Sequence, residues 1–165
     1  MRKVKFLLAL ALALAAGAAG AADRVIYPEP GAARADLAAA LRRAAATHRR
    51  VLLDFGGNWC PDCLVLDIYF HDPRNKPILE AGFVVVHVNI GRMDANLDVA
   101  EKYGVPIGKG VPALAVLSER GTLLYSQKNG EFEAMRRMDS SSVTEFLKKW
   151  RPGGAGCSMM AVSCQ

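Results

Sequence analysis

The sequence predicts an α/β protein with one central mixed sheet and helices on both faces. Strand-like and helix-like segments alternate along the chain, which favours parallel strand pairing. The segment 83–90 is apolar on both of its alternating faces, as expected for a central strand that is covered on both sides. Two short strands near the C-terminal end are joined by Glu119-Arg120-Gly121, which is typical of a hairpin and adds an antiparallel edge. The length of 165 residues fits a single domain.

The first elements are a strand over 24–27, a helix over 34–48 and a strand over 51–55. The helix is amphipathic, because Leu37 and Leu41 lie four residues apart among alanines and arginines. The second strand is an apolar run with one acid inside it.

A helix over 60–70 follows, with Pro61 in its first turn, where a missing N–H is harmless. Asp72-Pro73 and Lys76-Pro77 are expected to break this helix before the strand over 83–90.

The second half contains a short helix over 97–103, the hairpin strands 113–117 and 122–126, and a last helix. Ser142 and Glu145 fit a capping box at the start of that helix. Its apolar residues follow at helical spacing, namely Val143, Phe146, Leu147 and Trp150.

Residues 1–22 have the layout of a cleaved secretory signal peptide. Basic residues at the start precede an apolar stretch over 6–16 and a run of small residues over 19–22. The alternative is an uncleaved membrane anchor, but the apolar stretch is shorter than the roughly 20 residues that a spanning helix needs. We therefore expect a mature domain over 23–151 in the periplasm, where disulfides persist.

The formal net charge of +5 is mostly a property of this leader, which holds three of the 21 lysines and arginines and none of the 16 acids. The rest of the chain gives no electrostatic reason to propose a nucleic-acid partner.

The strongest chemical signal is Trp59-Cys60-Pro61-Asp62-Cys63, between a predicted strand and a predicted helix. That context makes a Cys-x-x-Cys pair a redox motif. Backbone N–H groups at the helix start stabilise a thiolate on Cys60, and Cys63 lies one turn inward, where it can resolve a mixed disulfide. A structural disulfide and half of a zinc site are the alternatives, and zinc would need two more ligands.

The stretch LLDFGGNWCPDC, followed by a strand and then by GVPAL, resembles the thioredoxin superfamily over roughly residues 36–150. The run between residues 66 and 90 is most similar to secreted bacterial thioredoxin-like proteins and to the C-terminal domain of DsbD-type reductant transporters. The resemblance implies a thioredoxin-like three-layer fold and thiol–disulfide exchange.

The resemblance also implies site residues. Asp54 matches the buried acid that takes the proton of the resolving thiol. Pro112 matches the cis-proline facing the redox pair, which leaves the backbone of Val111 free to pair with an extended substrate. Trp59 matches the aromatic residue beside the nucleophile, where simple packing is an equal alternative.

The chain departs from the thioredoxin pattern at two points. Leu64 stands where thioredoxins usually carry a basic residue, and the dipeptide between the cysteines is Pro-Asp. Asp62 is expected to place a negative charge beside the pair, to disfavour the thiolate and to move the couple in the reducing direction. The three histidines are interpreted as structural, namely His48, His71 and His87.

The Gly-rich tail over 152–165 carries a second cysteine pair, Cys157 and Cys164. A disulfide between them is one reading. The others are a mobile dithiol, free thiols, or a copper(I) site that includes Met159 and Met160.

Together these observations predict an exported, monomeric thiol–disulfide oxidoreductase that reduces protein disulfides, with Cys60 as nucleophile and Cys63 as resolver. No dissociable cofactor or resident metal is expected, and a membrane-bound electron donor is the expected partner. The alternatives are a disulfide oxidase or isomerase, and a non-enzymatic copper-binding or partner-docking module.

Overall fold

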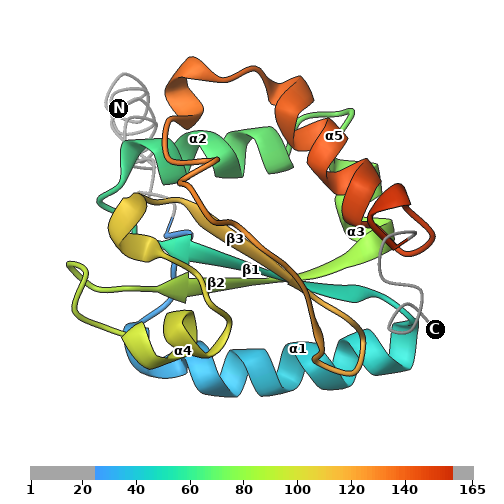
Figure 1. The fold of residues 1–165 in the computed structure, drawn as a ribbon, viewed down its shortest axis with the longest axis horizontal. Coiled ribbons are helices and arrows are strands. Elements are labelled where there is room, and N and C mark those ends of the chain that lie inside the picture. The colour runs from blue at the N-terminus through green and yellow to red at the C-terminus, as the bar shows by residue number, and fades with distance from the viewer. Residues whose placement is uncertain (1–24, 158–165) are drawn as a thin grey trace, which may run out of the picture.

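The structure, a computed structural model, describes residues 25–157 (Figure 1). Its centre is a four-stranded mixed sheet in the order β2-β1-β3-β4. The strands are β1 (Arg50–Gly56), β2 (Phe83–Asn89), β3 (Ala113–Leu117) and β4 (Leu123–Ser126).

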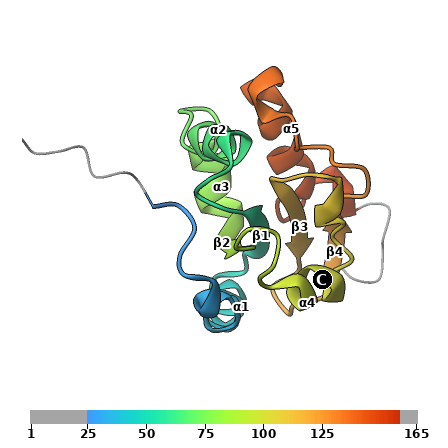
Figure 2. The same ribbon diagram turned by 90° about the vertical axis from the view of Figure 1, so that its left-hand side faces the viewer.

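Helices cover both faces of the sheet, which confirms the expected layers. They are α1 (Ala33–Thr47), α2 (Pro61–Phe70), α3 (Lys76–Gly82), α4 (Leu97–Lys102) and α5 (Ser140–Trp150). Short 3-10 turns add η1 (Pro30–Ala32), η2 (Ile107–Lys109), η3 (Met135–Arg137) and η4 (Ala155–Cys157). Figure 2 separates α1 and α4 below the sheet from α2, α3 and α5 above it. Each side of the sheet has its own apolar core.

One strand direction differs from the expectation. β1 and β2 are parallel, but β3 runs antiparallel to β1 as well as to β4. The connecting segment over 90–112, which holds α4 and η2, leaves the sheet and returns to it at the same end, so β3 starts near the end where β2 finished.

The alternation of side chains along β1 decides what faces the redox pair. All seven residues of this strand are buried. Val51, Leu53 and Phe55 belong to the core on the α1 side, and Leu52 belongs to the core on the α2 side. Asp54 shares the face of Leu52 because successive strand side chains alternate. An acid is therefore placed under α2, within an otherwise apolar strand.

Two segments outside the sheet differ from the sequence prediction. The expected strand over 24–27 is not formed in its described part. Instead, the side chain of Asn58 accepts hydrogen bonds from the N–H groups of Ile26 and Tyr27 and donates to the Tyr27 carbonyl. The helix over 60–70 ends at Phe70 as expected, but Lys76-Pro77 also starts α3, a helix that was not predicted, because proline is tolerated in a first turn.

The start of α5 also differs from the prediction. Asp139, not Ser142, is the N-cap, and its side chain accepts the N–H of Ser141 at 2.9 Å. The expected apolar stripe is confirmed, since Val143, Phe146, Leu147 and Trp150 are all buried.

The chain folds back after α5, since the Gly154 N–H donates to the Arg151 carbonyl. A Cβ on Gly156 would lie 2.8 Å from the Trp150 ring, so the first residues of the Gly-rich segment pack on the helix end.

The predicted leader and the tail beyond residue 157 lie outside the described residues, as does the side chain of Cys157. The predictions for Cys157 and Cys164 therefore remain predictions. Within residues 25–157, no helix combines the length and the apolar character needed to cross a bilayer.

Candidate active site

Cys60 and Cys63 form a disulfide at the start of α2, with their Cα atoms 5.2 Å apart. Cys60 is the N-cap residue in an extended conformation, and its sulfur accepts the N–H of Cys63 at 3.1 Å. That backbone donor aims at the position where a thiolate forms on reduction. Both side chains are buried, with exposures of 3% for Cys60 and 0% for Cys63.

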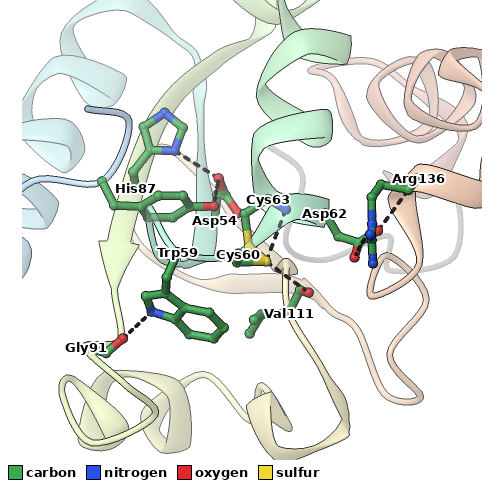
Figure 3. The surroundings of a disulfide bond; sticks show 10 residues. Asp54, Trp59, Cys60, Asp62, Cys63, His87, Gly91, Val111 and Arg136 are labelled. Atoms are coloured by element: carbon green, nitrogen blue, oxygen red, sulfur yellow. Dashed lines mark hydrogen bonds and ion pairs between the residues drawn. A yellow bond between two sulfur atoms is a disulfide. The ribbon is translucent and has the colours of Figure 1, made fainter. Parts of the chain in front are cut away.

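The loop before β3 contacts the disulfide from the side away from the Cys63 N–H. The Val111–Pro112 peptide bond is cis, and the carbonyl oxygen of Val111 lies 3.5 Å from the Cys60 sulfur (Figure 3). Val111 also packs against the cluster formed by the two cysteines and Tyr27. The backbone next to Pro112 is thus in contact with the reacting sulfur.

Trp59 forms the rim of the site next to Cys60. Its side chain is 39% exposed, and its indole Nε1 donates to the carbonyl of Gly91. The guanidinium of Arg92 lies 5.7 Å from the ring centre, within the range of a cation–π contact. The loop after β2 therefore holds this exposed aromatic ring in place.

Asp54 lies beneath the redox pair and is 1% exposed. Its Oδ2 accepts the hydroxyl of Tyr27 at 2.8 Å and lies 2.9 Å from Nδ1 of His87. Its Oδ1 is buried and has no hydrogen-bond partner among the described residues. One oxygen is thus held in place while the other keeps its lone pairs for a proton.

Gly56 allows Tyr27 and Cys63 to approach each other. A Cβ on Gly56 would lie 2.5 Å from the Tyr27 hydroxyl oxygen and 2.7 Å from the Cys63 sulfur. The Tyr27 hydroxyl that binds Asp54 and the sulfur of Cys63 therefore lie on either side of the space that a Gly56 side chain would fill. Burial raises the pKa of Tyr27 well above its ordinary value, and the negative charges of Asp54 and Asp67 raise it further, so this hydroxyl stays a neutral donor.

The environment of Asp62 corrects the expectation of an unbalanced negative charge. One carboxylate oxygen accepts the backbone N–H of Arg136 at 2.8 Å, and the other accepts its Nε at 3.1 Å. Asp62 points away from the disulfide toward this partner (Figure 3). Asp62 therefore does not by itself make the couple reducing.

Comparison with known proteins identifies the family of this chain. The sequence profile of a thioredoxin-like family matches residues 32–118. The chain belongs to the thioredoxin-like family. Comparison with curated proteins finds no significant match.

Two solved structures extend the likeness. A disulphide isomerase from Xylella fastidiosa Temecula1 is 34% identical with a TM-score of 0.72, over 76% of this chain and 96% of that one. A thioredoxin from Thermus thermophilus is 23% identical with a TM-score of 0.53, over 80% of this chain and 90% of that one, and shows the fold alone. The resemblance to DsbD-type domains stays a prediction.

The thioredoxin-like fold brings together all the residues that the sequence singled out around the pair, namely Asp54, Trp59, Cys60, Cys63, Val111 and Pro112. Sequence reasoning missed Tyr27, His87 and Arg136. His87 could have been found, because pairing the two apolar strands in register places it beside Asp54. Tyr27 and Arg136 come from irregular segments, and no periodic signal points to them. Within residues 25–157, no group of three or more His, Cys, Asp or Glu side chains is arranged to hold a metal ion.

Proposed function

We propose that this thioredoxin-like protein is a thiol–disulfide oxidoreductase that reduces protein disulfides. The carrying observation is the N–H of Cys63 directed at the Cys60 sulfur, beside the Val111 carbonyl. A thiolate held at a helix N-terminus is the form of cysteine that attacks disulfides.

The reaction starts from the reduced pair. The Cys60 thiolate attacks one sulfur of the substrate disulfide, forms a mixed disulfide and releases the first substrate thiolate. Cys63 then gives its thiol proton to Asp54, attacks the Cys60 sulfur and displaces the second substrate thiolate. The substrate gains two electrons, and the pair returns to the disulfide seen in the structure.

Substrate binding is assigned to the surface around the disulfide. The backbone of Val111 pairs with an extended substrate segment, which gives affinity without demanding a particular sequence. The exposed ring of Trp59 supplies an apolar contact next to the reacting sulfur.

The proposed compartment is the periplasm, on the evidence of the leader-like residues 1–22. Each turnover consumes two electrons, so net reduction there requires a donor, for which a membrane-bound dithiol protein is proposed. No cofactor is required for the exchange itself, and the protein is proposed to act as a monomer.

The test is trapping. The Cys63→Ser variant should accumulate a mixed disulfide with a substrate protein through Cys60, while the Cys60→Ser variant should trap none. Cys157 and Cys164 are replaced by serine in both, so that the tail contributes no adducts. Absence of a Cys60 adduct with any disulfide-containing protein overturns the proposal.

The net direction needs a second measurement. Equilibration with glutathione buffers should give a potential nearer the thioredoxin value of about −270 mV than the DsbA value of about −120 mV. A value above about −150 mV overturns net reduction and favours an oxidase.

Disulfide isomerisation is a second candidate, favoured by the printed name of the structure from Xylella fastidiosa Temecula1. It uses the same first attack, but a substrate thiol rather than Cys63 resolves the mixed disulfide. A protein with scrambled disulfides separates the two. If the protein is an isomerase, the Cys63→Ser variant also restores the activity of the scrambled substrate protein. If it is a reductase, the variant does not, because reduction needs Cys63.

A further inference from the structure

We propose that His87 carries the proton of Cys63 from Asp54 to solvent, and that its titration sets the pH dependence of the resolving step. This inference rests on the proposed thiol–disulfide exchange and adds a residue to it. His87 acts through Asp54 and is therefore a relay residue, without contact with the reacting sulfur atoms.

The strand register places the two side chains together. Asp54 and His87 are partners in the parallel ladder of β1 and β2, so both project from the same face of the sheet. The ring nitrogen Nδ1 of His87 lies 2.9 Å from Oδ2 of Asp54 (Figure 3). A proton on the carboxyl group is one hydrogen bond away from the ring.

The inner end of this path lies close to the resolving sulfur. Oδ1 of Asp54 is buried without a hydrogen-bond partner among the described residues. The Tyr27 hydroxyl donates to Oδ2 and lies on the same side of Gly56 as the Cys63 sulfur. A buried acceptor without a partner calls for an explanation, and a transient proton provides one.

The outer end reaches the surface. The side chain of His87 is 24% exposed, whereas that of Asp54 is 1% exposed. His87 also lines a cavity of about 300 Å³ between α1 and the edge strand β2. A proton that reaches the ring can therefore leave to water without crossing the core.

The charges around the ring come from every side of the cluster. Asp54 faces it from β1, Asp36 and Arg43 line the same cavity from α1, and Asp67 on α2 acts on the neighbouring Tyr27. Histidine is the side chain that normally titrates between pH 5 and 8, which suits a relay that loads and unloads in each turnover.

Before the step, Asp54 is a carboxylate and His87 is neutral, with its proton on the ring nitrogen that faces away from Asp54. The S–H proton of Cys63 passes to Asp54, and the sulfur electron pair forms the bond to the Cys60 sulfur while the substrate thiolate leaves. Asp54 passes the proton to Nδ1 of His87, and the imidazolium releases a proton to water from its other ring nitrogen. Asp54 is then again a carboxylate, and His87 returns to its starting tautomer by proton exchange with water before the next turnover.

The test uses the reduced full-length chain with Cys157 and Cys164 replaced by serine, mixed rapidly with an aromatic disulfide that releases a coloured thiolate. The first phase reports attack by Cys60 and the second reports resolution by Cys63. Attack on this small substrate does not depend on protein disulfides, so the inference can fail or hold independently of the proposed substrate class. Far-UV circular dichroism of each variant reports whether it is folded.

We expect the second phase of the parent protein to show a titration step that belongs to His87. His87→Gln, which keeps a hydrogen-bonding amide but cannot titrate, should remove this step and slow the second phase about 10-fold, with the first phase unchanged. Tyr27→Phe is the matched control, because it removes the other hydrogen bond to Oδ2 and should keep the step. An unchanged pH profile in His87→Gln overturns the relay.

A second readout avoids any variant. The ring nitrogens of His87 in the reduced parent protein can be followed by NMR across the same pH range. Their midpoint should coincide with that of the second phase. A midpoint separated from it by more than about one pH unit overturns the proposal.

Discussion

Arg136 binds the carboxylate of Asp62 through both its backbone N–H and its side-chain Nε, at 2.8 and 3.1 Å. These residues are 74 positions apart in sequence, so the segment between β4 and α5 neutralises a charge inside the Cys-x-x-Cys motif. The electrostatics of the redox pair is therefore shared between α2 and a distant segment.

Removing this partner should make the couple more reducing. Arg136→Gln removes the positive charge beside the Asp62 carboxylate. The remaining negative charge disfavours the Cys60 thiolate and lowers the reduction potential. Exposed ion pairs contribute about 0.2–1 kcal/mol, so the shift should be roughly 4–20 mV, measured by equilibration with glutathione. Arg137→Gln removes a neighbouring exposed charge and is the control. Equal shifts in both variants would show that the Asp62 contact is irrelevant.

The two active cysteines should differ in reactivity. In the reduced protein at neutral pH, Cys60 should be alkylated at least about 10-fold faster than Cys63, because it is the residue at the helix N-terminus that accepts a backbone N–H. Peptide mapping after brief alkylation measures both rates, with the cysteines of the tail replaced by serine. Equal rates at the two positions would contradict the assignment of Cys60 as nucleophile.

Gly56→Ala should damage both stability and resolution. The added methyl would lie 2.5 Å from the Tyr27 hydroxyl oxygen and 2.7 Å from the Cys63 sulfur, so the site must shift. Overpacking of this kind costs about 1–3 kcal/mol, measurable by denaturant unfolding of the oxidised protein. Gly108→Ala is the control, because a Cβ there meets nothing within 4 Å. A Gly56→Ala protein as stable as the control would refute the close approach.

The Asp139 cap of α5 should stabilise the protein at neutral pH and lose this effect in acid. The hydrogen bond from Ser141 lowers the pKa of Asp139, so the folded state favours the carboxylate. Its stabilising effect is complete above the unfolded pKa of about 3.9 and is lost as pH falls through the lower folded pKa. Asp139→Ala should therefore lower the melting temperature by roughly 2–4 °C at pH 7. The difference from the parent protein should shrink below about pH 4, whereas Ser142→Ala should have little effect at either pH. If Ser142→Ala lowered the melting temperature more than Asp139→Ala, Ser142 would be the N-cap after all, as expected from the sequence.

Local patterns predicted the elements that are regular over several residues. The apolar runs of β1 and β2, the 3.6-residue stripe of α5 and the strand–Cys-x-x-Cys–helix order each depend on side chains close in sequence, and each element is confirmed. The expected central position of the strand over 83–90 was wrong, because β2 lies at the edge of the sheet. The direction of β3 was missed because it depends on the end of the sheet to which the segment over 90–112 returns, which no local pattern encodes.

The surroundings of the redox pair were harder to predict. Tyr27 reaches Asp54 across 27 positions, and Arg136 reaches Asp62 across 74, both from segments without regular structure. Such contacts follow from tertiary packing and leave no periodic trace in the sequence. His87 is an intermediate case, since its place is fixed by the register between two strands that the sequence does predict.

The clamp that Asn58 forms on residues 26 and 27 has a kinetic consequence. Asn58 lies in the turn just before Cys60, and its contact with Tyr27 closes a loop of 31 positions. Helices and the hairpin can form before that closure, but the Tyr27–Asp54 contact cannot. During refolding, recovery of helical content can therefore precede completion of the hydrogen bonds around Asp54.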